Sequence, residues 1–342
     1  MYSYWKNNQL KLSPWLFLAP GIFIFLLYVI VPIFQSVALS FYEWDGLGLK
    51  TYIGLSNYVE LLDDYAFHTS LKNNVIWLLL CLLAIPAGLF TALFLNQTVH
   101  GIRIYKSLFF FPFVISQVVV GLVFTWFYDP SNGLLNVILE AFGFNPVAIL
   151  ADEDYVTYGI IAAGLWPQTA YCMIIYLTGL NSVDPELIEA GRIDNARGWR
   201  LLWYVILPQL KPATFIAIVV TVVGALRSFD LISIMTRGGP WGSSRVLAYY
   251  MYEKALSEYG YRMGYAAAIA VILLAIMMIY IAVILYRLYR DERVFSYVSY
   301  SNRKNQTTNS ATIQSRFAYF YYYLAAPSTG SGINFNTHWC RH

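Results

Sequence analysis

Apolar residues occur in long runs that short polar segments separate. Six runs are expected to cross a membrane as helices, at about 15–39, 74–95, 106–127, 156–180, 212–236 and 264–286. Each is near the ~20 apolar residues that a helix needs to span the hydrocarbon core. The first run exceeds the ~7–15 apolar residues of a signal peptide, and no clean small-x-small cleavage site follows it, so it is predicted to stay as a span. The pattern predicts an all-α, polytopic integral membrane protein with six transmembrane helices.

The positions of Lys and Arg predict the orientation. With the N-terminus inside, the cytoplasmic segments before the tail hold eleven of these residues and the outer loops hold six. Because cytoplasmic loops are enriched in Lys and Arg, both termini are predicted to be cytoplasmic. The predicted layout is a cytoplasmic N-terminus (1–14), a transmembrane domain (15–286) with a long cytoplasmic loop at 181–211, and an atypical cytoplasmic tail (287–342), disordered after 296.

The composition fits a membrane protein without its own catalytic chemistry. Of the 342 residues, 58% are hydrophobic and 12% are charged, against about 25% charged in soluble domains. A net charge of +3 is too small to indicate nucleic acid binding. The three cysteines and four histidines are scattered and there is no phosphate-binding loop, so neither a metal, a cofactor nor an enzymatic activity is expected. Work on a solute would draw on an ion gradient or on another chain.

The fifth run contains the ionisable residues Arg227 and Asp230. At i and i+3 of a helix they would share one face and could form an ion pair. Charges inside a span are functional candidates, so both residues are candidates for the translocation path or its gate. A self-neutralised structural pair is the alternative. A proton relay needs more partners than this pair, which favours energy supplied by a partner chain.

The charged loop between the fourth and fifth runs is predicted to form a helix–turn–helix. Asp184-Pro185-Glu186 is a helix start signal, Asn195 tolerates a left-handed turn, and a second helical stretch from Ala196 is expected to end at Pro208. On the cytoplasmic side such a segment can meet a soluble partner. An ordinary amphipathic helix on the membrane surface is the alternative.

The loop resembles the EAA loop of permease subunits of binding-protein-dependent ABC importers, which reads E-A-A, three residues, G, nine residues and I-x-L-P. The spacing matches without a gap, and three positions differ: Gly191 for Ala, Asn195 for Gly and Val205 for Ile. Gly191 weakens the first helix by up to ~1 kcal/mol. The matching and intervening loop residues taken as the candidate coupling site are Glu189, Ala190, Gly191, Asp194, Asn195, Val205, Leu207 and Pro208.

Two further stretches are similar to carbohydrate-type permeases. RIYKSLFFFPFVISQVVVGLVFTWFYDPSNGLLN, starting at Arg103, is similar to their third span and the loop that follows it. LRSFDLISIMTRGGPWGSSR, from Leu226 to Arg245, resembles their R-x-F-D…T-x-G-G-P pattern, which adds Phe229 to the path candidates. Within it, Gly238, Gly239 and Pro240 are predicted to form a tight outer turn facing a binding protein, or else a plain turn that ends the span. The stretch P-W-L-F-L-A-P-G at Pro14–Gly21 fits the first subunit of a heterodimeric pair.

The resemblance implies a type I ABC importer permease fold in a bacterial or archaeal inner (plasma) membrane. It implies a second homologous permease, two cytoplasmic ATP-binding subunits, an extracytoplasmic solute-binding protein and a sugar substrate, with ATP bound by the partner subunits. Glu189 would be the charge contact to the ATPase, and Leu207 and Pro208 would fix the loop against the fifth span. A gradient-driven secondary carrier and a membrane anchor for a cytoplasmic partner are the alternatives.

Overall fold

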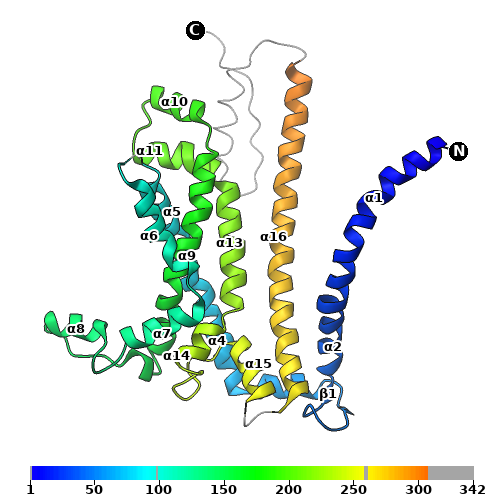
Figure 1. Cartoon of the computed structure of the whole chain (residues 1–342), viewed down its shortest axis with the longest axis vertical. Coiled ribbons are helices and arrows are strands. Elements are labelled where there is room, and N and C mark those ends of the chain that lie inside the picture. The colour runs from blue at the N-terminus through cyan, green and yellow to red at the C-terminus, as the bar shows by residue number, and fades with distance from the viewer. Residues whose placement is uncertain (1, 98, 258–260, 307–342) are drawn as a thin grey trace, which may run out of the picture. The chain divides into compact units, whose positions relative to one another are not determined.

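The computed structural model describes residues 2–97, 99–257 and 261–306, almost all of them helical (Figure 1). The first part contains α1 (Tyr2–Phe25), η1 (Leu26–Ile30), α2 (Val31–Leu39), a hairpin of β1 (Tyr42–Glu43) and β2 (Thr51–Tyr52), α3 (Ser56–Asp63), α4 (Tyr65–Cys81), α5 (Ala84–Leu95), α6 (Ile102–Val114), α7 (Gln117–Phe127), α8 (Leu134–Ala141) and η2 (Ile149–Ala151). The second part contains α9 (Val156–Asn181), α10 (Pro185–Ile193), α11 (Trp199–Leu201), η3 (Leu202–Ile206), α12 (Leu207–Gln209), α13 (Lys211–Leu226), α14 (Asp230–Met235), α15 (Leu247–Leu256) and α16 (Met263–Gln306).

Contacts divide the chain into two units. One comprises Met1–Glu186 and Gln209–Ala282, and the other comprises Leu187–Pro208 and the chain from Val283 onward. Among the described residues, five helical segments are long and apolar enough to cross a membrane: Ser13–Leu39, Tyr65–Leu95, Val156–Asn181, Lys211–Met235 and Met263–Arg287. A bent helix pair raises the number to as many as six. The prediction of an all-helical membrane protein with up to six spans is therefore confirmed.

The third predicted span, 106–127, is not one straight helix. It divides into α6 and α7, whose axes differ by 96°. Ile115 and Ser116 are extended, and the Ser116 hydroxyl accepts a hydrogen bond from the N–H of Val119 at 3.3 Å. Ser116 is thus the N-cap of a new helix, and a serine at this position is a recognised start signal. Hydropathy alone does not detect the break, because apolar residues continue on both sides of it.

Two other spans are also interrupted. The second begins at Tyr65, well before the predicted 74, and breaks between α4 and α5 at Leu82 and Leu83. Pro86 follows in the first turn of α5, where its missing N–H costs least. In the fifth span α13 ends at Leu226 and α14 starts at Asp230.

The chain contains two π-helical turns, η1 and η3, among its described residues, and each is followed by a proline two residues after its end. In η1 the N–H of Val31 donates to the carbonyl of Leu26 and Pro32 follows; in η3 the N–H of Leu207 donates to Leu202 and Pro208 follows. A proline inside a helix lacks one donor and its ring meets the carbonyl four residues back. The wider π turn accommodates that crowding, so both helices continue through their proline.

The tightest helix contact joins α5 to α9. An added Cβ at Gly88 would lie 2.5 Å from Cys172 Cβ and 2.8 Å from the Met173 nitrogen. Nearby, the second halves of the broken spans also meet, since an added Cβ at Gly121 of α7 would lie 3.1 Å from Ile234 Cγ2 of α14. The main buried cluster around these helices includes Trp77, Val120, Ile160, Ile161 and Ile232.

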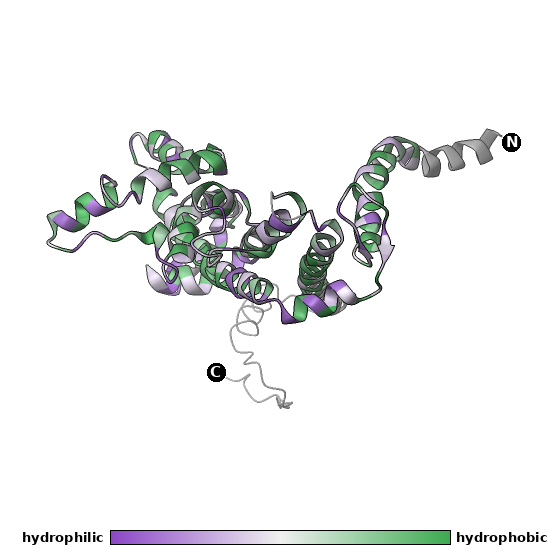
Figure 2. Ribbon diagram, turned by 90° about the horizontal axis from the view of Figure 1, so that it is seen from below, coloured by the Kyte–Doolittle hydropathy of each residue, from purple (hydrophilic) through white to green (hydrophobic). Residues whose placement is uncertain are grey.

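Large apolar side chains remain exposed on most spans. Figure 2 shows that hydrophobic residues predominate along the ribbons of these helices. None of the apolar window of the first span, Ser13–Leu39, is buried within the chain. Lipid or other subunits are the environments that suit such surfaces. At the other end, α16 extends to Gln306, past the start of the predicted disordered tail at 296. Residues 307–342, the rest of that predicted tail, lie outside the described residues.

A carboxylate joins three elements at the start of the second span. Asp64 caps α4 by accepting the N–H of Ala66 at 2.9 Å, and its other oxygen accepts the hydroxyls of Tyr250 (α15) and Tyr265 (α16). Arg262 pairs with Glu60 of α3 close by, both of its terminal nitrogens lying 2.6 Å from carboxylate oxygens. Burial alone would raise the pKa of Asp64, but the hydrogen bonds from Tyr250, Tyr265 and Ala66 lower it below its ordinary value.

Asp64→Asn is expected to lower the melting temperature of the purified protein at neutral pH. Asparagine keeps the cap of α4 but loses the charge-assisted bonds to the two tyrosines, each worth about 1.5–3 kcal/mol. Because the folded-state pKa is lowered, the ionised aspartate stabilises the protein above ~pH 4, its unfolded value, and this stabilisation is lost as pH falls through the folded value. Thermal unfolding from pH 7 to pH 3 should therefore show the gap between wild type and variant closing at acid pH. A gap that is constant with pH would contradict this role.

Candidate functional site

The first helix of the charged loop starts where the sequence predicts. Asp184 precedes α10, and its side chain accepts the N–H of Glu186 at 2.9 Å, with Pro185 as the first helical residue. The N–H of Asp184 in turn donates to Gln209 Oε1 at 3.0 Å, which joins the two ends of the loop. The loop therefore leaves and re-enters the spans at one fixed point.

The turn after α10 is left-handed, as the sequence predicts. Asn195 has φ 64°, the N–H of Ala196 donates to the carbonyl of Gly191 at 2.9 Å, and the N–H of Asn195 donates to Arg192 at 3.1 Å. This pair of bonds is the Schellman arrangement, which satisfies the last carbonyls of a helix. Asparagine is the commonest residue after glycine at this position. The substitution of Asn for the Gly of the EAA pattern therefore preserves the turn.

The second helix begins later than expected. Ala196 is not helical, and α11 starts only at Trp199, because Gly198 has φ 53° and ψ −118°, outside any helical conformation. From there α11, η3 and α12 are continuous to Gln209, so Pro208 lies inside the helical stretch and does not end it. The π turn of η3 is what permits this.

Gly191 is the point of contact between the two helices of the loop. An added Cβ there would lie 2.9 Å from Val205 Cγ2 and 3.2 Å from Leu201 Cδ1. Two of the three departures from the EAA pattern, Gly191 and Val205, thus face each other across the hairpin. The glycine weakens α10 as an isolated helix but permits this close approach.

The other candidate residues of the loop differ in exposure. Glu189 and Asp194 are exposed, whereas Ala190, Leu207 and Pro208 are half-buried and Val205 is buried. Among the large apolar side chains of the second helix, Leu202 is buried. Trp199 and Trp203 are 61% and 53% exposed, and their rings meet edge to face with centroids 6.2 Å apart. The loop therefore presents both carboxylates and an aromatic pair on its surface.

The expected ion pair between Arg227 and Asp230 is not formed. The helix ends at Leu226, Phe229 has φ −143°, and Asp230 opens the next helix, so the two charges are not on one helical face. Both side chains are exposed, and neither takes part in the ion pairs of the described chain, Arg245–Glu253 and Arg262–Glu60. A broken span leaves backbone groups without helical partners, and transporters place such breaks where backbone lines a cavity.

Phe229 lies in an aromatic cluster rather than on an open surface. Its ring centroid is 5.3 Å from that of Tyr252 and 5.9 Å from that of Tyr249, both on α15. Tilted and edge-on contacts at these separations are favourable. Phe229 thus links the break in the fifth span to α15.

Gly238, Gly239 and Pro240 lie in a compact turn. The N–H of Gly239 donates to the carbonyl of Thr236 at 2.9 Å, the Gly239–Pro240 peptide is cis, and Gly238 has φ 79°. An added Cβ at Gly238 would lie 2.7 Å from Tyr249 Cε1, so a larger residue is excluded on two grounds. Trp241, next in the chain, is 91% exposed.

Three residues that the sequence did not single out hold this turn in place. Asn73 Nδ2 donates to the carbonyls of Ser243 and Arg245 at 2.5 and 2.7 Å, and Thr157 donates to Ser243 at 3.3 Å. Asn74 Oδ1 accepts the N–H of Leu247, the first residue of α15, at 2.8 Å. Two adjacent asparagines in an apolar run indicate in the sequence that polar partners must exist. The sequence does not identify these partners, which lie some 170 residues away in the chain.

Within the described residues no group of three or more His, Cys, Asp or Glu side chains is arranged to hold a metal ion. Cys81 and Cys172 are buried free thiols.

Interrupted apolar helices and a capped, charged hairpin between two of them in the sequence are features of a membrane transport subunit. Residues 84–292 match the family described as binding-protein-dependent transport system inner membrane component, and this chain belongs to that family. It is thus a permease subunit of an ABC importer and a protein of the inner membrane. Family membership replaces the gradient-driven carrier and the membrane anchor as interpretations.

The matches to curated relatives extend over most of the length of those relatives. A probable ABC transporter permease protein, YurN of Bacillus subtilis, is 36% identical over 79% of this chain and 93% of its own. The sn-glycerol-3-phosphate transport system permease UgpA of Rhizobium meliloti is 32% identical over 78% and 91%, and the alpha-glucoside permease AglF of the same species is 33% identical over 78% and 80%.

Among solved structures, a chain of a bacterial ABC transporter that imports the acidic polysaccharide alginate superimposes with a TM-score of 0.70. The match covers 83% of this chain and 99% of that chain at 23% identity. This likeness confirms the permease fold.

Proposed function

We propose that this chain is the transmembrane subunit of an ATP-driven importer for a sugar or sugar-like solute. Relatives named for alpha-glucosides, for xylose and arabinose and for sn-glycerol-3-phosphate support this substrate class. The chain would form half of the pathway with a second homologous permease, as the first subunit of a heterodimeric pair. Both termini would lie in the cytoplasm, and a solute-binding protein would deliver the solute from outside.

ATP would be bound and hydrolysed by separate cytoplasmic subunits, with no cofactor held by this chain. The observation that carries the proposal is the capped hairpin at 185–208, whose exposed carboxylates and tryptophans suit contact with a soluble protein. Glu189, on the exposed side of α10, is the proposed charge contact with the ATPase. Leu207 and Pro208 would connect the hairpin to α13.

The loop is anchored so that a push on it reaches the spans. Asp184 and Gln209 join its ends. The helices before and after the loop, α9 and α13, are joined by two further hydrogen bonds. Tyr176 donates to Thr214 Oγ1 at 3.1 Å, and Gln168 donates to Thr221 Oγ1 at 2.9 Å. Hydrogen bonds of this kind across membrane helices are worth about 0.6–2 kcal/mol each. We therefore propose that α9 and α13 move as one rigid lever, and that the break at 227–229 above it lines the path.

Glu189→Lys is expected to reduce recovery of the ATPase and to abolish solute uptake, because it reverses the proposed contact charge. The protein would be co-expressed with the ATPase and second permease encoded beside it, extracted in detergent and purified. Wild type should recover the ATPase stoichiometrically and Glu189→Lys at least about tenfold less, the effect of 1.4 kcal/mol. Pro208→Leu should likewise abolish uptake while the chain still inserts.

Glu153→Lys makes the same charge reversal in a predicted outer loop and should leave ATPase recovery unchanged. The amount of chain in the membrane fraction shows whether each variant inserts. Normal uptake by both Glu189→Lys and Pro208→Leu would remove the coupling role from this loop. A wild-type chain that inserts stably and never recovers an ATPase would contradict the importer function itself.

A further inference from the structure

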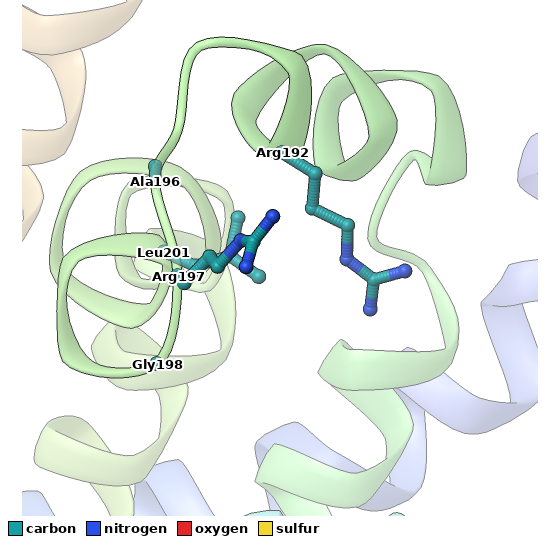
Figure 3. A pocket seen from close by; sticks show the side chains of 5 residues that line it. All are labelled: Arg192, Ala196, Arg197, Gly198 and Leu201. Carbon is teal, nitrogen blue, oxygen red and sulfur yellow. The ribbon is translucent and has the colours of Figure 1, made fainter.

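The hairpin contains a hollow that the EAA resemblance does not account for. It has a volume of about 380 Å³ and is lined by Arg192, Ala196, Arg197, Gly198 and Leu201 (Figure 3). It lies between the end of α10 and the start of α11. Figure 3 shows the side chains of Arg192 and Arg197 reaching into the space between these two elements. The hollow is therefore bounded by two cations and by the apolar side chains of Ala196 and Leu201.

The backbone of the turn brings the two arginines to one place. Asn195, at φ 64°, ends α10 directly after the turn that carries Arg192, and Gly198, at φ 53°, reverses the chain directly after Arg197. An added Cβ at Gly198 would meet nothing within 4 Å, so the glycine is needed for its backbone angle and not for space. The two left-handed residues thus set the direction of Arg197 toward the hollow.

Neither guanidinium forms an ion pair with another residue in the part of the chain that the structure describes. The ion pairs among the described residues are Arg245–Glu253 and Arg262–Glu60, and Arg192 and Arg197 belong to neither. A guanidinium presents a planar set of donors that matches a carboxylate bidentately. A lining of two guanidinium groups and two apolar side chains has the chemistry that suits one acidic group on a short hydrocarbon stem.

The surroundings favour an acidic side chain of a protein over an anionic lipid headgroup. Lipid-binding segments carry clusters of about 4–8 basic residues. Here the three arginines of 187–208 alternate with Glu189 and Asp194, which would be repelled by an anionic membrane surface. Beside the hollow, Trp199 and Trp203 are exposed and in edge contact, and Ile193 is 85% exposed. Large apolar anchors next to a charged pocket are typical of the centre of a protein interface.

We propose that Arg192 and Arg197 together receive a single Asp or Glu side chain of the ATPase subunit. This inference rests on the proposed function and specifies the partner chemistry of the same loop. It adds a second charge contact of opposite sign to that of Glu189, so that α10 offers an acidic residue and, one turn later, a basic pocket. Contacts of both signs would fix the orientation of the hairpin on the ATPase as well as its attachment.

The test measures binding of the ATPase to the complete permease pair in nanodiscs of neutral lipid. Arg192→Gln and Arg197→Gln should each weaken binding at least about fivefold at 50 mM salt. The loss of affinity in the double variant should be smaller than the product of the two single losses, because both residues bind the same acidic group. Arg200→Gln removes an equally exposed arginine of the same hairpin that does not line the hollow, and should change binding less than twofold. Arg197→Lys, which keeps charge but not bidentate geometry, should recover only part of the affinity.

Other outcomes would overturn the inference and are separable from failure of the proposed function. If wild type binds the ATPase and the two pocket variants bind equally well, the pocket is not a contact while the importer function stands. Equal losses in Arg200→Gln and the pocket variants would show a general charge effect. A loss that appears only in nanodiscs with anionic lipid would assign the arginines to the membrane. Assembly with the second permease, measured by gel filtration, shows that each variant is folded.

Discussion

Replacing Gly88 by leucine is expected to prevent the permease from folding into a stable, extractable form. Gly88 lies where α5 crosses α9, and a Cβ there would meet Cys172 Cβ at 2.5 Å, the Met173 nitrogen at 2.8 Å and the carbonyl carbon of Cys172 at 2.9 Å. Two of these three atoms are backbone, which no rotamer change can move. Overpacking of a core typically costs about 1–3 kcal/mol, and we expect leucine here to exceed that range because the helices themselves must separate.

The measurement is the fraction of membrane-inserted protein that elutes as a single species after detergent extraction, together with its melting temperature. Gly88→Ala should show a smaller loss in the same direction. Gly224→Leu is the matched control, since Gly224 is a helical glycine in another span and an added Cβ there would meet nothing within 4 Å. A Gly88→Leu protein that melts with wild type would show that α5 and α9 do not pack as described.

The hairpin at 185–208 could be predicted from the sequence because its signals are local. Asp184-Pro185 starts α10 and Asn195 ends it, each through bonds to residues no more than five positions away. The predicted start of the second helix at Ala196 does not take Gly198 into account. This glycine is the residue in the sequence that indicates the later start at Trp199. Local capping rules thus give the loop almost completely.

The breaks in the spans were harder to predict, because hydropathy averages over ~19 residues and does not resolve a two- or three-residue interruption. The hydropathy pattern predicts Arg227 and Asp230 on one helical face, whereas α13 ends at Leu226, directly before Arg227, and Asp230 starts the next helix. The extended residues Ile115 and Ser116 likewise lie inside the run 106–127, which hydropathy predicts to be one helix. In both cases polar residues inside an apolar run mark the interruption.

Contacts between distant segments could not be predicted at all. Asn73 and Asn74 bind the backbone of 243–247, and the tyrosines that bind Asp64 are some 190 residues from it. Nothing in the neighbourhood of these residues specifies the partner. The close approaches at Gly88, Gly121 and Gly179 have the same origin: a glycine in a helix is visible in the sequence, but its opposite surface is not.

Gly179→Ala is expected to impair transport, and Ala213→Gly in the same chain is expected to restore it. Gly179 lies near the end of α9, directly before the hairpin, and an added Cβ would be 2.8 Å from Ala213 Cβ of α13 and 3.1 Å from Leu210 Cδ2. Leucine can move its methyl group, but the Cβ of Ala213 is fixed by the backbone. The extra methyl therefore pushes apart the two helices that we propose to act as one lever.

The paired variants separate this strain from other effects. Gly179→Ala adds one methyl group to the contact and Ala213→Gly removes one. The double variant therefore has the same number of methyl groups at the contact as wild type, with the methyl group on α9 instead of α13. Their opposite changes in helix propensity, up to ~1 kcal/mol each, also cancel. Strain of about 1–3 kcal/mol that falls on one of two transport conformations would shift their balance about 5- to 150-fold. Solute-stimulated ATP hydrolysis and uptake by the assembled complex should fall in Gly179→Ala and recover in the double variant. Two single effects that simply add in the double variant would mean that α9 and α13 are not in contact at this point, and the rigid lever would have to be abandoned.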